Sequence, residues 1–286
     1  MKGDKSSADL TGFQKTHQRR QSRRIYQEYR EKYRPRVFKI AILLLAITLS
    51  ISAVVLTSAR GSTVPKSPSI ISTSNLLAPT MIDDLRGQKL VALTFDDGPS
   101  PYSEAILDIL KKEKVTATFF VMGMKINQYR ATVQREYREG NQVASHATNH
   151  KNLARLSPPA RQAEMNYTAA LIEQTIGVRP SVLRPPYGEW NGNVLGDSSV
   201  PLVLWSVDPR DWEYRNVDWI YQNVMSNVRD GSIILLHDVY PESVEAVAKI
   251  VPALKAQGYA LVTVNRLMMA RGASFEPGHY YRYLYP

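Results

Sequence analysis

The chain has 286 residues, of which 36 are Lys or Arg and 26 are Asp or Glu, so its formal net charge is +10. With 44% hydrophobic residues, the sequence has enough apolar side chains for one or two folded domains. It contains no cysteine, which excludes disulfides, thiolate nucleophiles and Cys-ligated zinc or iron–sulfur sites. Any metal must therefore be held by His and carboxylate side chains.

Most of the positive charge lies in a basic arm at residues 1–39, which holds 12 Lys or Arg and 4 Asp or Glu. The remainder carries a net charge of only +2. Residues 40–59 are uncharged and would form a helix about 30 Å long, enough to cross a bilayer. We therefore expect one transmembrane helix at 40–59. A cleaved signal peptide and a buried core helix are the alternatives, but a signal peptide has a shorter apolar region and a soluble helix has a polar face.

The charges around this span predict its orientation. Far more Lys and Arg precede the span than follow it, so the positive-inside rule places residues 1–39 in the cytoplasm and everything after residue 60 outside the cell. We thus expect a single-pass cell-membrane protein. The basic arm is explained by orientation and by anionic lipid headgroups, so we expect no nucleic-acid partner. Residues 60–80 are rich in Ser, Thr and Pro and are predicted to form an extracellular stalk.

Residues 81–286 are predicted to form one folded domain in which strands and helices alternate. The expected strands are 89–95, 116–122, 142–145, 181–183, 201–207, 232–236 and 260–264. Helical patterns include 159–176, 217–228 and 244–256. This alternation predicts an α/β fold, a distorted (β/α) barrel with about seven units, preceded by the transmembrane helix. No glycine-rich phosphate loop follows a strand, which disfavours a dinucleotide-binding fold.

Polar side chains follow five of the expected strands. In a (β/α) barrel these positions all lie at the C-terminal face, where active sites form. The clusters are Asp96 with Asp97, His146 with His150, Arg184 to Gly188, Asp208 with Asp211, and His237 with Asp238.

Two of these clusters have the composition of a metal site. His146 and His150 are spaced i, i+4, which would place both imidazoles on one side of a helical turn. A carboxylate would complete a facial site with open positions for water and substrate. Asp96 and Asp97 are adjacent in a loop, so one side chain can bind the metal while the other takes part in proton transfer. A structural or solvent-exposed role for the histidines and a simple turn at the aspartates remain alternatives.

The other clusters suggest acid–base chemistry and a sugar-binding wall. His237, at the mouth of an apolar strand, is either a core residue or a general acid. Arg184 needs a carboxylate partner, and Asp96 and Asp211 are both available. Aromatic residues near the clusters are either core or suited to stacking on sugar rings: Tyr187, Trp190, Trp205 and Trp212.

Together these residues resemble the five motifs of the polysaccharide deacetylases of carbohydrate esterase family 4, the NodB-homology domain, over residues 88–267. The matching segments are Thr94 to Pro99 (TFDDGP), His146 to His150 (HATNH), Arg184 to Gly188 (RPPYG), Asp211-Trp212, and Leu235 to Asp238 (LLHD). One position departs from the family pattern: Ala147 stands where Ser or Thr is usual. The hydroxyls of Ser145 and Thr148 are the candidates to replace the missing group.

The resemblance implies a role for each matching residue. Asp97, His146 and His150 would hold a divalent metal, zinc in the first place, with Co²⁺ or Mn²⁺ as alternatives. Asp96 would be the general base and Arg184 its partner. The backbone N–H of Tyr187 would stabilise the oxyanion, and His237, oriented by Asp211, would protonate the leaving amine. Leu235 and Trp212 would line the pocket for the acetyl methyl group.

The sequence therefore predicts a metal-dependent hydrolase that removes N-acetyl groups from N-acetylglucosamine in a polysaccharide. Because the domain is expected to face outward on a stalk, peptidoglycan is the predicted substrate. The alternatives are a deacetylase of chitooligosaccharide or poly-N-acetylglucosamine, an O-acetyl xylan esterase, and a non-catalytic glycan-binding wall protein. The sequence predicts no oligomeric state. Its tyrosine-rich tail, residues 272–286, is expected to pack on the barrel or to contact glycan.

Overall fold

The computed structural model describes Leu85 and residues 87–286. The predicted basic arm, transmembrane helix and stalk lie outside these residues and remain predictions. Within the described part, no helix has both the length and the apolar character needed to cross a membrane.

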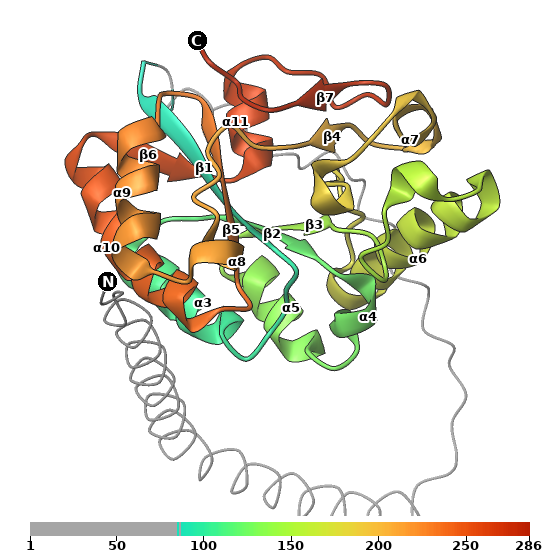
Figure 1. Cartoon of the computed structure of the whole chain (residues 1–286), viewed down its shortest axis with the longest axis horizontal. Coiled ribbons are helices and arrows are strands. Elements are labelled where there is room, and N and C mark those ends of the chain that lie inside the picture. The colour runs from blue at the N-terminus through green and yellow to red at the C-terminus, as the bar shows by residue number, and fades with distance from the viewer. Residues whose placement is uncertain (1–84, 86) are drawn as a thin grey trace, which may run out of the picture. The chain divides into compact units, whose positions relative to one another are not determined.

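A parallel sheet forms the centre of the described domain (Figure 1). Its order is β3-β2-β1-β5, and β6 pairs with the first half of β1. The central strand is buried along nearly its whole length, as expected for an apolar strand covered on both faces. The strands are β1 (Lys89–Asp96), β2 (Thr118–Val121), β3 (Gln142–Ser145), β5 (Ser232–His237) and β6 (Tyr259–Val262).

Isolated parallel bridges continue the strand pairing from β3 towards β5. They join Ser145 to Leu183, Leu183 to Leu202 and Val207 to Ile234. This pattern is consistent with the predicted distorted barrel. The strand expected at 181–183 is reduced to the single residue Leu183, which forms a bridge on each side, since the prolines that flank the segment have no N–H for a ladder. The strand expected at 201–207 is regular only at β4 (Leu202–Val203).

Helices cover the outside of the sheet. Helices α3 and α9 pack against α10, while α5 and α4 pack against α6 (Figure 1). The predicted helix at 159–176 is confirmed as α6, and Gly177 ends it in a left-handed conformation with φ 79°. The longer helices are α3 (Ser103–Glu113), α5 (Arg130–Arg138), α6 (Pro158–Ile176), α9 (Val217–Asn227) and α10 (Pro241–Ala256). The shorter ones are α4 (Gly123–Ile126), α7 (Gly192–Asp197), α8 (Asp211–Tyr214) and α11 (Val264–Ala270).

The tyrosine-rich tail packs on the domain through its backbone and through Leu284, Phe275 and Tyr281, whose side chains lie against the core. Strand β7 (Tyr280–Tyr281) pairs with β4, and Leu284 N donates to Gly231 O at 2.8 Å. Leu284 is buried, whereas Tyr280, Tyr283 and Tyr285 are exposed. Gly231 is required here, because a Cβ at this position would lie 2.1 Å from the Leu284 carbonyl oxygen.

Candidate active site

The polar residues singled out in the sequence meet in one cavity of about 390 Å³ at the C-terminal ends of the strands. Eight of the ten predicted site residues line it: Asp96, Asp97, His146, His150, Tyr187, Trp212, Leu235 and His237. The other two, Arg184 and Asp211, are fully buried behind the wall. The site is therefore built from segments that are more than 140 residues apart in the chain but adjacent in the parallel sheet.

Asp97, His146 and His150 form a cluster with the geometry of a metal site. Each offers one ligand atom, and these atoms lie within 4.8 Å of one another. Asp97 Oδ1 is 3.5 Å from His146 Nε2 and 3.2 Å from His150 Nε2. This oxygen is buried and has no hydrogen-bond partner among the described residues. A buried carboxylate oxygen without a hydrogen-bond partner thus faces two imidazole nitrogens. A divalent cation binds to such a set of ligand atoms.

The charge states of the cluster also suit a cation. Burial alone would raise the pKa of Asp97, but the neighbouring imidazoles, His146 above all, hold it well below its ordinary value. Burial and the charge of His146 lower the pKa of His150, so this imidazole is readily neutral. His146 Nδ1 lies 2.8 Å from Arg184 O. Since a carbonyl only accepts, Nδ1 carries a proton. Burial alone would lower the pKa of His146, but Asp96 and Asp97 raise it, so a cation bound at Nε2 would replace a second proton.

The two histidines are brought together by a loop, so the expectation of a helical turn was wrong. Residues 146–150 form no helix, and Ala147 and His150 have φ values of 58° and 54°. This left-handed backbone costs energy for residues with a Cβ and must be held by its surroundings.

Glu164 of α6 holds this loop. Its Oε2 accepts from Thr148 N at 3.0 Å and from Asn149 N at 2.8 Å, and its Oε1 accepts from Asn149 Nδ2 at 2.9 Å. Thr148 Oγ1 also donates to Glu164 O at 2.8 Å. Of the two hydroxyls expected to compensate for Ala147, only that of Thr148 supports the loop, because Ser145 Oγ has no hydrogen-bond partner in the described domain.

Asp96 is held by Arg184, as predicted. Arg184 Nη1 donates to Asp96 Oδ1 at 2.7 Å and to Thr94 Oγ1 at 2.7 Å. The remaining guanidinium nitrogens donate to the carbonyl oxygens of Val203 and Leu204, so the fully buried cation is fixed in one orientation. The ion pair fixes the position of Asp96, whose other oxygen, Oδ2, lies 3.7 Å from His146 Nε2.

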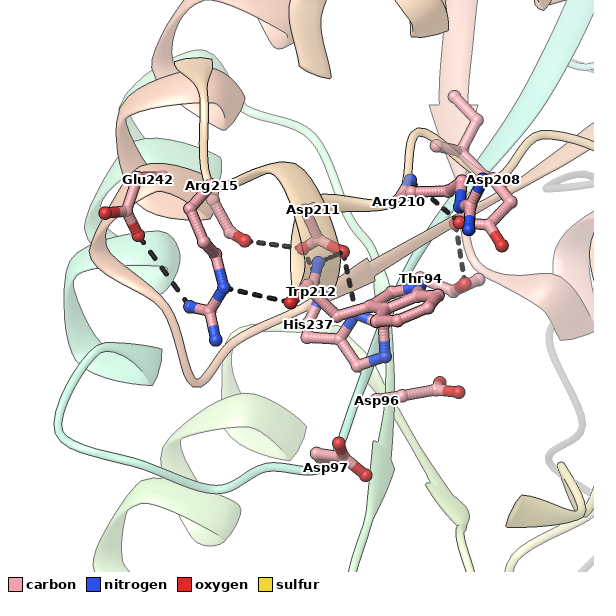
Figure 2. Close-up of polar contacts among 12 residues, drawn as sticks. Thr94, Asp96, Asp97, Asp208, Arg210, Asp211, Trp212, Arg215, His237 and Glu242 are labelled. Carbon is pink, nitrogen blue, oxygen red and sulfur yellow. Dashed lines mark hydrogen bonds and ion pairs between the residues drawn. The ribbon is translucent and has the colours of Figure 1, made fainter. Parts of the chain in front are cut away.

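Asp211 orients His237 (Figure 2). Asp211 Oδ1 lies 2.8 Å from His237 Nδ1, and Oδ2 accepts from His237 N at 2.8 Å and from Ser243 Oγ at 2.5 Å. Burial by itself would lower the pKa of His237, but the hydrogen bond and charge of Asp211 raise it to about 9. His237 therefore carries a proton at neutral pH, with Nε2 available to donate it.

The three predicted pocket residues take different positions in the wall. Leu235 is 3% exposed, whereas Tyr187 and Trp212 are exposed at the rim. Tyr187 has a φ of 64°, and its ring lies against His150 with centroids 4.5 Å apart.

Glu164 and Tyr240 contribute to the site although no sequence motif predicted them. Tyr240 lines the cavity, and Arg215 lies over its ring. Glu164 lies within a helix, where acidic residues are common, and no motif contains it. Tyr240 follows His237 and Asp238 at the end of β5, and this position is the signal that could have identified it. Their roles appear only once α6 and the β5–α10 turn are in place.

Comparison with known proteins agrees with this arrangement. The family model of polysaccharide deacetylase matches residues 84–199. The chitooligosaccharide deacetylase of Bradyrhizobium sp. is 36% identical over 203 residues, which cover 64% of this chain and 93% of that protein. The chain therefore belongs to the polysaccharide deacetylase family.

Two further relatives act on peptidoglycan by name. The peptidoglycan-N-acetylmuramic acid deacetylase PdaC of Bacillus subtilis is 45% identical over 181 residues. The peptidoglycan-N-acetylglucosamine deacetylase PgdA of Listeria monocytogenes is 38% identical over 180 residues. Each match covers 63% of this chain but only 39% of the relative, so the chain matches about two fifths of their length.

A solved structure shows the same fold and includes a metal. The family 4 acetyl xylan esterase from Clostridium thermocellum, described in complex with a cobalt ion, aligns with a TM-score of 0.66 at 33% identity. The alignment covers 68% of this chain and 99% of that one.

Proposed function

We propose that this protein is a metal-dependent hydrolase that removes N-acetyl groups from N-acetylglucosamine residues of peptidoglycan. The observation that carries the proposal is the cavity that brings Asp97, His146 and His150 together with Asp96 and His237. Such an arrangement offers cation ligands, a base and a protonated acid around one space. The relatives named as peptidoglycan deacetylases support the choice of substrate.

The proposed mechanism assigns each step to a residue. When bound, a divalent cation, Zn²⁺ by preference, supplies Lewis-acid activation of water and of the acetamide carbonyl. Asp96, held in place by Arg184, accepts the proton of the attacking water. The backbone N–H of Tyr187 stabilises the developing oxyanion. His237 donates its proton to the leaving amine while Asp211 holds the imidazolium, and Leu235 and Trp212 enclose the acetyl methyl.

The experiment that tests this function uses the purified full-length chain in a mild detergent with one equivalent of zinc. We expect acetate release from peptidoglycan, with free amines appearing on N-acetylglucosamine in mass spectra of the digested glycan. Asp96→Asn should abolish most of this release. Equal acetate release by wild type and Asp96→Asn, or none by either, would sink the proposal.

N-acetylmuramic acid is a second candidate site of deacetylation. The name of PdaC, which shares 45% identity with this chain, favours it. The same mass spectra separate the two, since the free amine appears either on the sugar with a lactyl ether or on its neighbour. Assays with chitooligosaccharide and acetylated xylan, run in parallel, test the remaining alternative substrates.

We also propose that residues 40–59 anchor the protein in the cell membrane with the deacetylase domain outside. The support is the uncharged 20-residue span preceded by the basic arm. Protease added to intact cells without their wall should digest the domain and leave an N-terminal fragment protected. Protection of the domain until the membrane is lysed would contradict this topology.

A further inference from the structure

Besides Asp96 and Asp211, one more buried carboxyl group lies beside the active site, and no step of the proposed mechanism uses it. Asp238 follows His237, and its side chain is fully buried. Its Oδ2 accepts a hydrogen bond from Ser103 Oγ at the start of α3, and its main-chain oxygen accepts one from Ser100 Oγ. Ser103 Oγ in turn accepts from Ser100 N at 2.8 Å. Two hydroxyls thus connect the residue after β5 to the loop after β1.

The same carboxyl presses on the backbone next to the metal ligand Asp97. A Cβ built on Gly98 would lie 2.2 Å from Asp238 Oδ1 and 2.3 Å from Oδ2, which leaves no room for any side chain. On the other side of the loop, Gly98 O accepts from Met122 N at 2.8 Å and Asp97 O accepts from Lys125 Nζ at 2.7 Å. The loop is therefore held between the side chain of Asp238 on one side and the start of α4 on the other.

The environment of Asp238 favours a neutral group. Burial raises its pKa to about 7, although the Ser103 hydrogen bond acts in the opposite direction. Its Oδ1 has no hydrogen-bond partner among the described residues, and neither carboxylate oxygen of the fully buried Glu136 has one. A side-chain amide has nearly the same shape and retains an acceptor for Ser103. Asparagine should therefore replace this aspartate well, whereas alanine should not.

We propose that Asp238 is a positioning residue that fixes the Asp97 loop relative to His237 and so sets the spacing between the metal ligands and the general acid. The physical reason is that Asp238 connects the two groups. It follows the general acid His237 in the chain, and its side chain contacts Gly98, which follows the metal ligand Asp97. Removing its side chain leaves a space into which the loop can shift. The inference rests on the proposed function, because it assigns Asp238 to that machinery.

The test measures metal binding by the full-length protein before any substrate is added. Zinc affinity is obtained by competition with a chromogenic chelator, and ligand geometry from the visible absorption of the cobalt-loaded protein. We expect Asp238→Ala to weaken zinc binding about 10- to 100-fold, as when the supports of metal ligands are removed, and to alter the cobalt spectrum. Asp238→Asn should bind zinc with a dissociation constant within about threefold of the wild-type value.

A matched control separates positioning from general destabilisation. Val247→Ala removes a fully buried core side chain of α10 without touching the loop. It should lower the melting temperature and leave zinc affinity and the cobalt spectrum unchanged. With an N-acetylated oligosaccharide as substrate, Asp238→Ala should lower kcat more than it changes KM, because the reacting groups are misplaced while the rim aromatics remain.

If Asp238→Ala does not fold, Ser100→Ala takes its place, since it removes the hydrogen bond to the Asp238 carbonyl and otherwise only the one that Ser100 Oγ accepts from Tyr102 N. Wild-type zinc affinity and cobalt spectrum in the folded variant would overturn the proposal. So would an equal loss of zinc affinity in Val247→Ala. A wild-type protein that binds zinc but releases no acetate would overturn the proposed function instead, and would leave the role of Asp238 in metal binding standing.

Discussion

Two buried carboxylates in the active site face two cations, and each pair holds a reactive side chain in place. Asp96 is paired with Arg184, and Asp211 with His237. Arg184 and Asp211 have no exposed surface, so their contacts are not weakened by solvent. At the scale of single residues, the chemistry depends on partners that lie outside the cavity.

The Asp96–Arg184 pair should be more important for activity than for the fold. Asp96→Ala leaves a buried guanidinium without its carboxylate and should lower the free energy of unfolding by about 3–5 kcal/mol. The double variant Asp96→Ala/Arg184→Met, which removes both charges, should recover much of that loss but none of the activity. Denaturant unfolding and acetate release measure the two effects. A double variant less stable than Asp96→Ala would show that the hydrogen bonds from Arg184 to Val203 O and Leu204 O outweigh the cost of its unpaired charge.

The raised pKa of His237 predicts the alkaline limit of activity. Because the folded-state pKa is about 9, the acid is protonated at lower pH, and kcat/KM should fall as the pH rises through about 9. Asp211→Asn removes the main favourable interaction of the imidazolium and leaves burial, which lowers the pKa. The alkaline limb should therefore move towards neutral pH. Ser243→Ala, which removes one of the hydrogen bonds to Asp211, should shift it less.

At the scale of elements, a helix supports a metal loop whose backbone is strained. The loop from His146 to His150 has two left-handed residues other than glycine, and the carboxylate of Glu164 in α6 accepts three hydrogen bonds from it. The loop conformation thus depends on an element that follows it in the chain. The loop is thus supported by Thr148 and Glu164 although Ala147 offers no hydroxyl.

Glu164→Gln should weaken zinc binding about 10-fold or more, because an amide cannot accept at both of its heavy atoms and the loop loses a support. Lys151 offers the matched control. Its exposed ammonium lies 3.4 Å from Glu164 Oε1, and exposed ion pairs contribute little. The Lys151→Met variant should therefore bind zinc as tightly as the wild-type protein. Chelator competition measures both variants, and equal affinities for all three proteins would contradict this role of α6.

At the scale of the whole domain, the parallel sheet brings residues from opposite ends of the chain to one face. Asp97 follows β1, the two histidines follow β3, and His237 ends β5. A cation bound by ligands from two strands binds the folded state and not the unfolded chain. Metal binding should therefore stabilise the domain as a whole.

Zinc at 100 times its dissociation constant should add about 2.7 kcal/mol to the free energy of unfolding. For a domain of this size, that corresponds to a rise in melting temperature of about 5–10 °C. Chelation should reverse the shift, and His150→Ala should show almost none at the same zinc concentration. Calorimetry with and without chelator checks this prediction, and an identical shift in His150→Ala would place the metal elsewhere.

The sequence by itself predicted the elements that depend on local pattern. The apolar run at β1, the helix at α6 and its glycine stop were all placed within a residue or two, because periodicity and capping act over a few residues. The motif residues were also readable, since they cluster at strand ends. The anchor and stalk are likewise sequence predictions, outside the described residues.

Only the tertiary structure decided which groups touch. It pairs Arg184 with Asp96 and not with Asp211, and it has a loop where a helical turn was expected at His146. It also places Glu164 against the loop of His150, and Asp238 against the loop of Asp97. These contacts join residues 15 to 140 positions apart. No local propensity encodes them, because they depend on how buried polar groups find partners once the sheet and helices have packed.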